Sequence, residues 1–248
     1  MARAVATLAG GALVLTALAG CARPHVFGLR HDRAFTYGSL DSGSIAVGGV
    51  TSITGDAALS PSTRGQFESL LTTSLREVYP RLEVASPGAV ATGIGDSLHG
   101  RLLERYRLSG ELDSAAVHEI RARLAKPRYV VLARIEADLI DSTETVTRDT
   151  SDKKSKVEHV VLLRSRTMTV GFHVYDTSLM RAVWSGQLTR SEASSNSYDQ
   201  PRGFVASVVT AIVRGSPKYP APPTQTKVLR PLFEEFAESL PQPPKRRA

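Results

Sequence analysis

A single cysteine, Cys21, is the feature that most limits how this 248-residue chain can fold. One thiol cannot form an intramolecular disulfide, and it cannot supply a cysteine-based zinc site. The folded part must therefore be held together by packing, and a chain of this length can bury a sufficient core. We expect no metal and no other cofactor.

The residues that precede Cys21 predict how this cysteine is used. Residues 1–20 contain one basic residue followed by an uncharged, mostly apolar stretch from Ala4 to Gly20. This is the layout of a secretion signal, and it is too short and too rich in glycine for a membrane span, which needs about 20 apolar residues. The residues Leu18-Ala19-Gly20-Cys21 match the lipobox of bacterial lipoproteins. We expect Cys21 to carry diacylglyceryl and palmitate chains and to become the first residue of the mature protein.

The sequence after the anchor divides into three parts. Residues 21–43 lack a clear periodicity and are expected to form a tether, and residues 44–214 are expected to form one α/β domain. Residues 215–248 contain a Pro-rich link, a short helix over Val228–Leu240 and a disordered tail. Ala22 follows the anchor instead of Asp, which resembles the address of outer-membrane lipoproteins facing the periplasm.

Hydrophobic periodicity predicts the elements of the domain. Apolar runs at Ser44–Val50 and Tyr129–Ile135 indicate buried strands, and the spacing of apolar residues predicts helices over 62–79, 96–109 and 114–126. Strands over 157–163, 167–175 and 180–191 form an antiparallel meander, with the polar stretch 141–156 as a hairpin loop. A helix is expected to start at Asp199. The fold class is mixed α/β, with helices on one face of a mixed sheet. We expect Val47, Leu71, Val130 and Leu132 to be buried together, and the only tryptophan, Trp184, to fill the core.

No catalytic or metal-binding motif is complete. His118-Glu119 lacks the second histidine of a zinc-protease helix, because position 122 is Ala. The remaining histidines show no metal-ligand spacing, and Trp184-Ser185-Gly186 lacks the flanks of a nucleophile elbow. We therefore expect no catalytic residue, and Cys21 is the only functional residue that the sequence predicts.

The net charge of +7 admits two interpretations. A basic surface favours acidic glycans, phosphorylated lipids or an acidic partner protein. Alternatively, the charge reflects an Arg-rich composition spread over the solvated surface. Nucleic acid is not expected as a partner, because secretion separates the protein from it and no aromatic-basic patch is present.

Three segments resemble the lipoprotein family that contains the curli secretion channel lipoprotein and the outer-membrane lipoprotein activators of penicillin-binding proteins. These segments are SIAVGGV from Ser44, RLAKPRYVVLARIEAD from Arg123 and TVGFHVYDTSLMRAVWSG from Thr169, so that the resemblance spans residues 44–191. It implies helices packed on a sheet, anchorage at the outer membrane and a role in binding or assembly.

These observations together predict a non-catalytic, outer-membrane-anchored lipoprotein that binds or scaffolds another envelope component, either a protein or a glycan. A first alternative is an enzyme that acts on the cell wall, which would need a carboxylate pair or a nucleophile in a cleft. A second alternative is a subunit of a secretion channel. A membrane-spanning strand needs about 9–11 alternating residues with one apolar face, and neither face of 141–163 is apolar enough.

Overall fold

The computed structural model describes residues 26–55, 58–124, 126–148, 157–201 and 218–243. Its elements are β1 (Phe27–His31), α1 (Tyr37–Gly43), β2 (Ile45–Ser52), α2 (Pro61–Val78), β3 (Val84–Ala85), α3 (Pro87–Ile94), α4 (Asp96–Ser109), α5 (Ser114–Arg123), β4 (Tyr129–Arg148), β5 (Val157–Asp176), β6 (Arg181–Pro201) and α7 (Gln225–Ser239). The strands form one sheet in the order β1-β6-β5-β4-β2-β3. The expected mixed α/β class is confirmed.

Helix boundaries follow the capping residues that the sequence offers. Ser60 caps α2 through its hydroxyl, which accepts a hydrogen bond from the backbone N–H of Thr63, and Pro61 occupies the first turn. Asp113 caps α5 in the same way through the N–H of Ala116. The helix α4 ends at Gly110, whose φ of +81° lies in the left-handed region that favours glycine. The predicted helices over 62–79 and 96–109 are thus confirmed.

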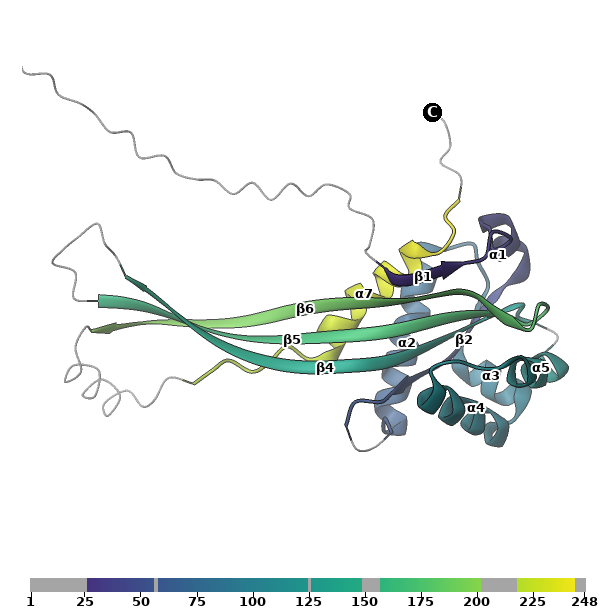
Figure 1. Ribbon diagram of the computed structural model, residues 1–248, viewed down its shortest axis with the longest axis horizontal. Helices are drawn as coiled ribbons and strands as arrows, with labels where there is room; N and C mark the ends of the chain where they lie inside the picture. Colours follow the sequence, from purple (N-terminus) through teal and green to yellow (C-terminus); the bar gives the residue numbers. More distant parts are fainter. Residues whose placement is uncertain (1–25, 56–57, 125, 149–156, 202–217, 244–248) are drawn as a thin grey trace, which may run out of the picture.

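Helices cover both faces of the sheet, whereas we expected them on one face. Alternate side chains of β2 and β4 point to opposite sides, so that Val47 and Val131 join one core cluster while Ala46 and Val130 join another. The first cluster includes α2 and α7, and the second includes α3, α4 and α5. Figure 1 shows the two groups of helices around the base of the sheet.

The predicted core residues are all buried, but they do not lie together. Val47 and Leu71 belong to the cluster under α2 and α7, and Val130 and Leu132 belong to the cluster under α4 and α5. The sheet separates the two pairs. Trp184 is only 1% exposed and packs edge-on against Phe236 at 5.2 Å between ring centroids, so its predicted place in the core is confirmed.

The expected tether differs from the structure after residue 26. The strand β1 (Phe27–His31) pairs antiparallel with β6, and His31 lies opposite Trp184. Thr36 then caps α1 with a capping box through Ser39. Phe35 and Leu40 are fully buried in the core cluster under α2 and α7, and this packing holds the segment against the body.

The polar stretch that we expected as a hairpin loop is largely strand. The strand β4 continues to Arg148 and β5 begins at Val157, and residues 149–156 lie outside the described part. The strand β6 runs to Pro201, so that the helix expected from Asp199 is wrong at its start, and its remainder at 202–217 is not described. The helix expected at Val228–Leu240 is confirmed as α7, although it packs into the main core.

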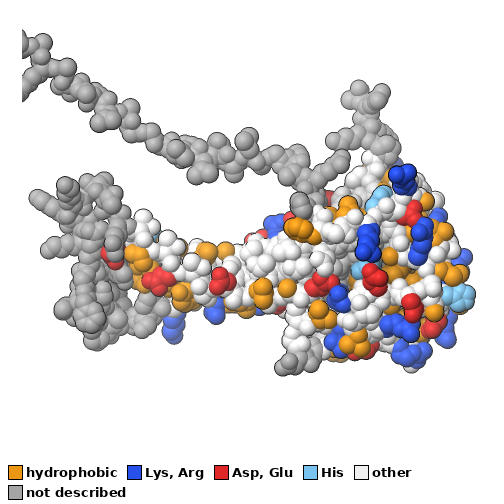
Figure 2. All heavy atoms as spheres, in the orientation of Figure 1, with side chains coloured by type: hydrophobic (Ala, Val, Ile, Leu, Met, Phe, Trp, Pro, Cys, Tyr) orange, Lys and Arg blue, Asp and Glu red, His pale blue; other side chains and the backbone are white. Residues whose placement is uncertain are grey.

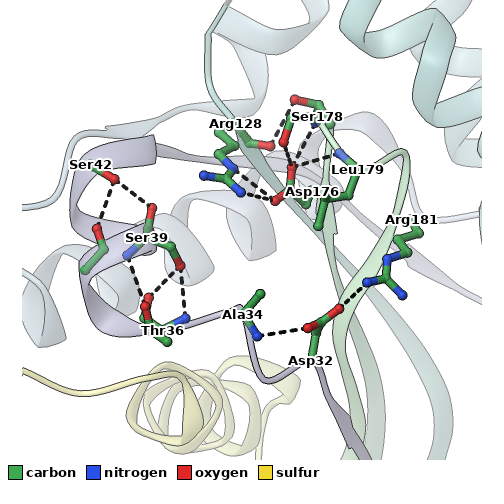
Figure 3. A network of polar contacts seen from close by, with 12 residues as sticks. Asp32, Ala34, Thr36, Ser39, Ser42, Arg128, Asp176, Ser178, Leu179 and Arg181 are labelled. Carbon is green, nitrogen blue, oxygen red and sulfur yellow. Dashed lines mark hydrogen bonds and ion pairs between the residues drawn. The ribbon is translucent and has the colours of Figure 1, made fainter.

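The turn between β5 and β6 is fixed by one buried carboxylate. Asp176 accepts hydrogen bonds from the backbone N–H groups of Ser178 and Leu179, and it pairs with the Arg128 guanidinium at 2.8 Å (Figure 3). Burial would raise the pKa of Asp176, but these donors outweigh it and hold the pKa below its usual range. On the other side of the hairpin, Arg181 pairs with Asp32 and so ties the turn to the segment after β1.

Candidate functional site

The three long strands extend well beyond the helical body and form an arm. Within the described residues, pairing of β4 with β2 ends at Ile135 and pairing of β6 with β1 ends at Gln187. The arm comprises residues 137–148 of β4, 157–169 of β5 and 189–201 of β6, and Figure 1 shows it projecting from the body. From Gln187 to Pro201 it measures about 46 Å at 3.3 Å per residue.

A bulge marks the point at which the arm leaves the body. The register between β4 and β5 shifts between Ile135 and Ala137, so that Glu136 is the extra residue. Glu136 pairs with Arg134 at 2.8 Å and accepts a hydrogen bond from the Gln187 side chain across the sheet. Gly171 makes room for this carboxylate, because a Cβ there would lie 2.7 Å from its oxygen.

One face of the arm is rich in hydroxyl groups and is named the hydroxyl face. The strand register places on it Thr143, Thr145, Thr147, Ser165, Thr167, Thr169, Thr189, Ser191, Ser195 and Ser197. Thr169 hydrogen-bonds Thr189 at 2.9 Å, and Thr167 donates to Ser191 at 3.0 Å. In the described part of this face the charged side chains are Asp141, His159 and Asp199, and the last two form an ion pair. Charges gather instead over the body (Figure 2).

The opposite face of the arm is held at its root by the C-terminal segment. Arg166 pairs with Asp138 at 3.0 Å and donates a hydrogen bond to the carbonyl of Pro223 at 2.7 Å. Gln225, at the start of α7, donates to the other oxygen of Asp138 at 2.7 Å. Arg190 pairs with Glu235 of the same helix. These contacts fix the direction of the arm relative to the body, and they leave the hydroxyl face uncovered by helices.

Exposed apolar side chains line the outer strand of the arm. Leu139 is 64% exposed, Ile140 46% and Val146 42%, and all three lie on β4. Successive side chains of a strand point to opposite faces, so these residues flank the outer edge of β4 on both sides. Beyond Ile135 this edge has no strand neighbour among the described residues. An unpaired edge with flanking apolar side chains is a template for adding another strand.

A polar pocket of about 440 Å³ lies at the base of the sheet, on the same side as the hydroxyl face. His173 forms its floor and hydrogen-bonds the buried Tyr106 hydroxyl at 3.0 Å, while Glu111 lies 3.7 Å from the other ring nitrogen. Burial lowers the pKa of His173, and Glu111 opposes this effect. The arrangement favours a neutral imidazole held by Tyr106, which can donate or accept one hydrogen bond toward the pocket.

The other candidate residues from the sequence are spread over the molecule. His31 and His99 hydrogen-bond backbone carbonyls of Phe35 and Gly48, and His118 is exposed on α5. In the portion that the structure describes, no three metal-ligating side chains come together. No helix of that portion is both long and apolar enough to cross a membrane. Residues 1–25, which include Cys21 and His25, lie outside the described residues.

The fold and its candidate surface define a mixed α/β protein with a long three-stranded arm. No protein-family model matches the chain, and no curated protein matches its sequence. Two solved structures are similar. The PelC dodecamer from Paraburkholderia phytofirmans has a TM-score of 0.35 and 15% identity, and the match covers 84% of this chain and 94% of that one. Lipoprotein GNA1162 from Neisseria meningitidis has a TM-score of 0.32 and 14% identity, covering 69% and 96%.

These similarities are too low to carry an argument about function. One of the two proteins is a lipoprotein, which is the broad class expected from the sequence. The particular family that the sequence resembles stays a prediction.

Proposed function

We propose that this chain is a lipid-anchored protein of the cell envelope that binds another envelope component through its arm and catalyses no reaction. The sequence of residues 1–21 supports the anchor, since a secretion signal leads directly to the only cysteine. The arm supports the binding role, because its length and its uncovered hydroxyl face exceed what the core requires. The partner is a protein that contributes an extended segment.

The outer edge of β4 carries this proposal. Leu139, Ile140 and Val146 would each lose exposed apolar surface if a segment were added beside β4, and the free backbone groups of the edge would gain hydrogen bonds. The bulge at Glu136 ends the pairing with β2 and leaves about 40 Å of β4 for a partner, from Glu136 to Arg148 at 3.3 Å per residue. Backbone hydrogen bonding along an edge selects a polypeptide rather than a glycan.

In-cell photo-crosslinking tests the proposal directly. A photoreactive amino acid replaces Leu139 in the full-length protein at its native expression level. The matched control replaces Leu108 of α4, which is 68% exposed and therefore equally accessible, but lies on the body. We expect one discrete protein adduct from position 139 and none from position 108. Equal adducts at both positions, or none at position 139, would contradict binding along β4.

Two further variants separate the proposal from its rivals. An enzyme would depend on the polar pocket, so Glu111→Gln should abolish complementation of a deletion strain if the chain is a cell-wall enzyme. Under our proposal this variant complements fully, because Glu111 is exposed and distant from the arm. A secretion channel subunit would place the arm across the membrane. Labelling of Thr143→Cys by an impermeant thiol reagent on intact cells would favour that alternative, since an acylated Cys21 offers no competing thiol.

A further inference from the structure

The point at which the chain enters the folded body lies close to the expected anchor. Five peptide steps separate Cys21 from Val26 and cannot span more than about 18 Å. Val26 itself is fixed, because it packs on Gly186 of β6 so closely that a Cβ there would lie 2.3 Å from its methyl carbon. An acylated Cys21 would therefore hold the surface around β1 against the bilayer.

That surface carries two exposed apolar side chains on one short strand. Phe27 is 55% exposed and Leu29 51% exposed, although β1 has only five residues. The register between β1 and β6 shifts between Phe27 and Arg30, and Gly28 lies at φ +61°, in the left-handed region that favours glycine. A bulge of this kind redirects side chains, and here it leaves both apolar groups outside the core.

The charges around β1 complement an anionic lipid surface. Residues 22–34 contain three arginines, Arg23, Arg30 and Arg33, and a single acidic residue, Asp32. Asp32 is already engaged, since it pairs with Arg181 and accepts a hydrogen bond from the N–H of Ala34. Arg30 and Arg33 are exposed. Arginines can keep their guanidinium groups at the headgroups while neighbouring apolar side chains enter the interface.

We infer that β1 is a membrane-docking strand, whose Phe27 and Leu29 insert into the interface of the bilayer that holds the acyl chains of Cys21, with Arg30 and Arg33 at anionic headgroups. This inference rests on the proposed lipid anchor. It adds a second attachment that fixes how the body sits on the membrane. An acyl anchor alone would leave the body free to rotate within the reach of residues 22–25.

Fluorescence quenching in vesicles tests the inference. The acylated full-length mature protein is reconstituted into phosphatidylethanolamine and phosphatidylglycerol vesicles with or without brominated acyl chains. Phe27→Trp adds a tryptophan to β1, and the parent protein supplies the background, because Trp184 is buried at 1% exposure. Matched controls are Leu108→Trp on the body and Leu139→Trp on the arm, which are 68% and 64% exposed in the parent.

We expect the added tryptophan at position 27 to emit at shorter wavelength and to lose most of its emission in brominated vesicles. The tryptophans at positions 108 and 139 should show neither change. Unquenched emission at position 27 from protein that floats with the vesicles would overturn the docking strand and leave the lipid anchor standing. Quenching at position 139 in its place would put the arm in the bilayer and also overturn the inference. Failure to float would overturn the anchor and the docking strand together.

Discussion

Removing the Phe236 ring should show how firmly α7 is built into the core. Phe236 is fully buried, stacks on Phe172 of β5 at 4.2 Å between ring centroids, and meets Trp184 of β6 edge-on at 5.2 Å. The same helix anchors Arg190 of the arm through Glu235. Phe236→Ala therefore removes a side chain that joins α7 to two of the three strands of the arm.

The magnitude follows from burial and from the two ring contacts. Truncation of a buried Phe to Ala costs about 3–5 kcal/mol of unfolding free energy. Phe236→Leu retains most of the volume and loses mainly the aromatic pairs, so it should cost about 1–2 kcal/mol. A domain of this kind has about 5–15 kcal/mol in total, and the Ala variant should stay folded with a much lower urea midpoint.

Trp184 provides the assay, because it is the only tryptophan and touches the altered site. Urea unfolding followed by its emission should give midpoints in the order wild type, Phe236→Leu, Phe236→Ala at a constant slope. Leu108→Ala, at an exposed position on α4, is the control and should change stability by less than about 0.5 kcal/mol. A midpoint for Phe236→Ala within the range of this control would refute the packing of α7 into the core.

Three other outcomes are expected. The pKa of Asp176 is lowered in the folded state, so its ionised form contributes stability that is present above about pH 4 and is lost as the pH falls through the folded pKa. Asp176→Asn should therefore lower stability at pH 7 and flatten the acid limb of a melting-temperature profile. Cys21→Ser should abolish incorporation of radiolabelled fatty acid, because no second thiol exists. Replacement of residues 149–156 by a short Gly-Ser turn should leave the melting temperature within a few degrees of wild type, and a larger loss would contradict their prediction as a solvated hairpin tip.

The central sheet could be predicted from the sequence because its signals are local. The run from Tyr129 to Ile135 is apolar on both sides, and it forms the middle of β4. Such a continuous run also indicates that both faces of a strand are covered. The expectation of helices on one face overlooked this, and the alternation of Val130 and Val131 between the two clusters is its structural consequence.

The arm was missed because polarity was interpreted as a loop. Thr143, Thr145 and Thr147 alternate with other residues in a strand pattern, and threonine favours strands. A strand exposed on its faces needs no apolar period, so hydrophobic periodicity cannot detect it. The strand β1 was missed for a different reason: its five residues are ordered by pairing with β6, which lies more than 150 residues away. No local pattern encodes such pairing.

The short distance between the anchor and β1 also limits where a partner of the arm can be. The strand β1 pairs with β6, so both run along a common direction, and β6 continues into the arm. If β1 lies on the bilayer, the arm extends along the membrane surface rather than away from it, apart from the twist of the sheet. Its partner would then have to be membrane-proximal, where confinement of both proteins raises their effective concentration. Loss of the anchor should consequently weaken function in cells more than it weakens the intrinsic affinity of the arm.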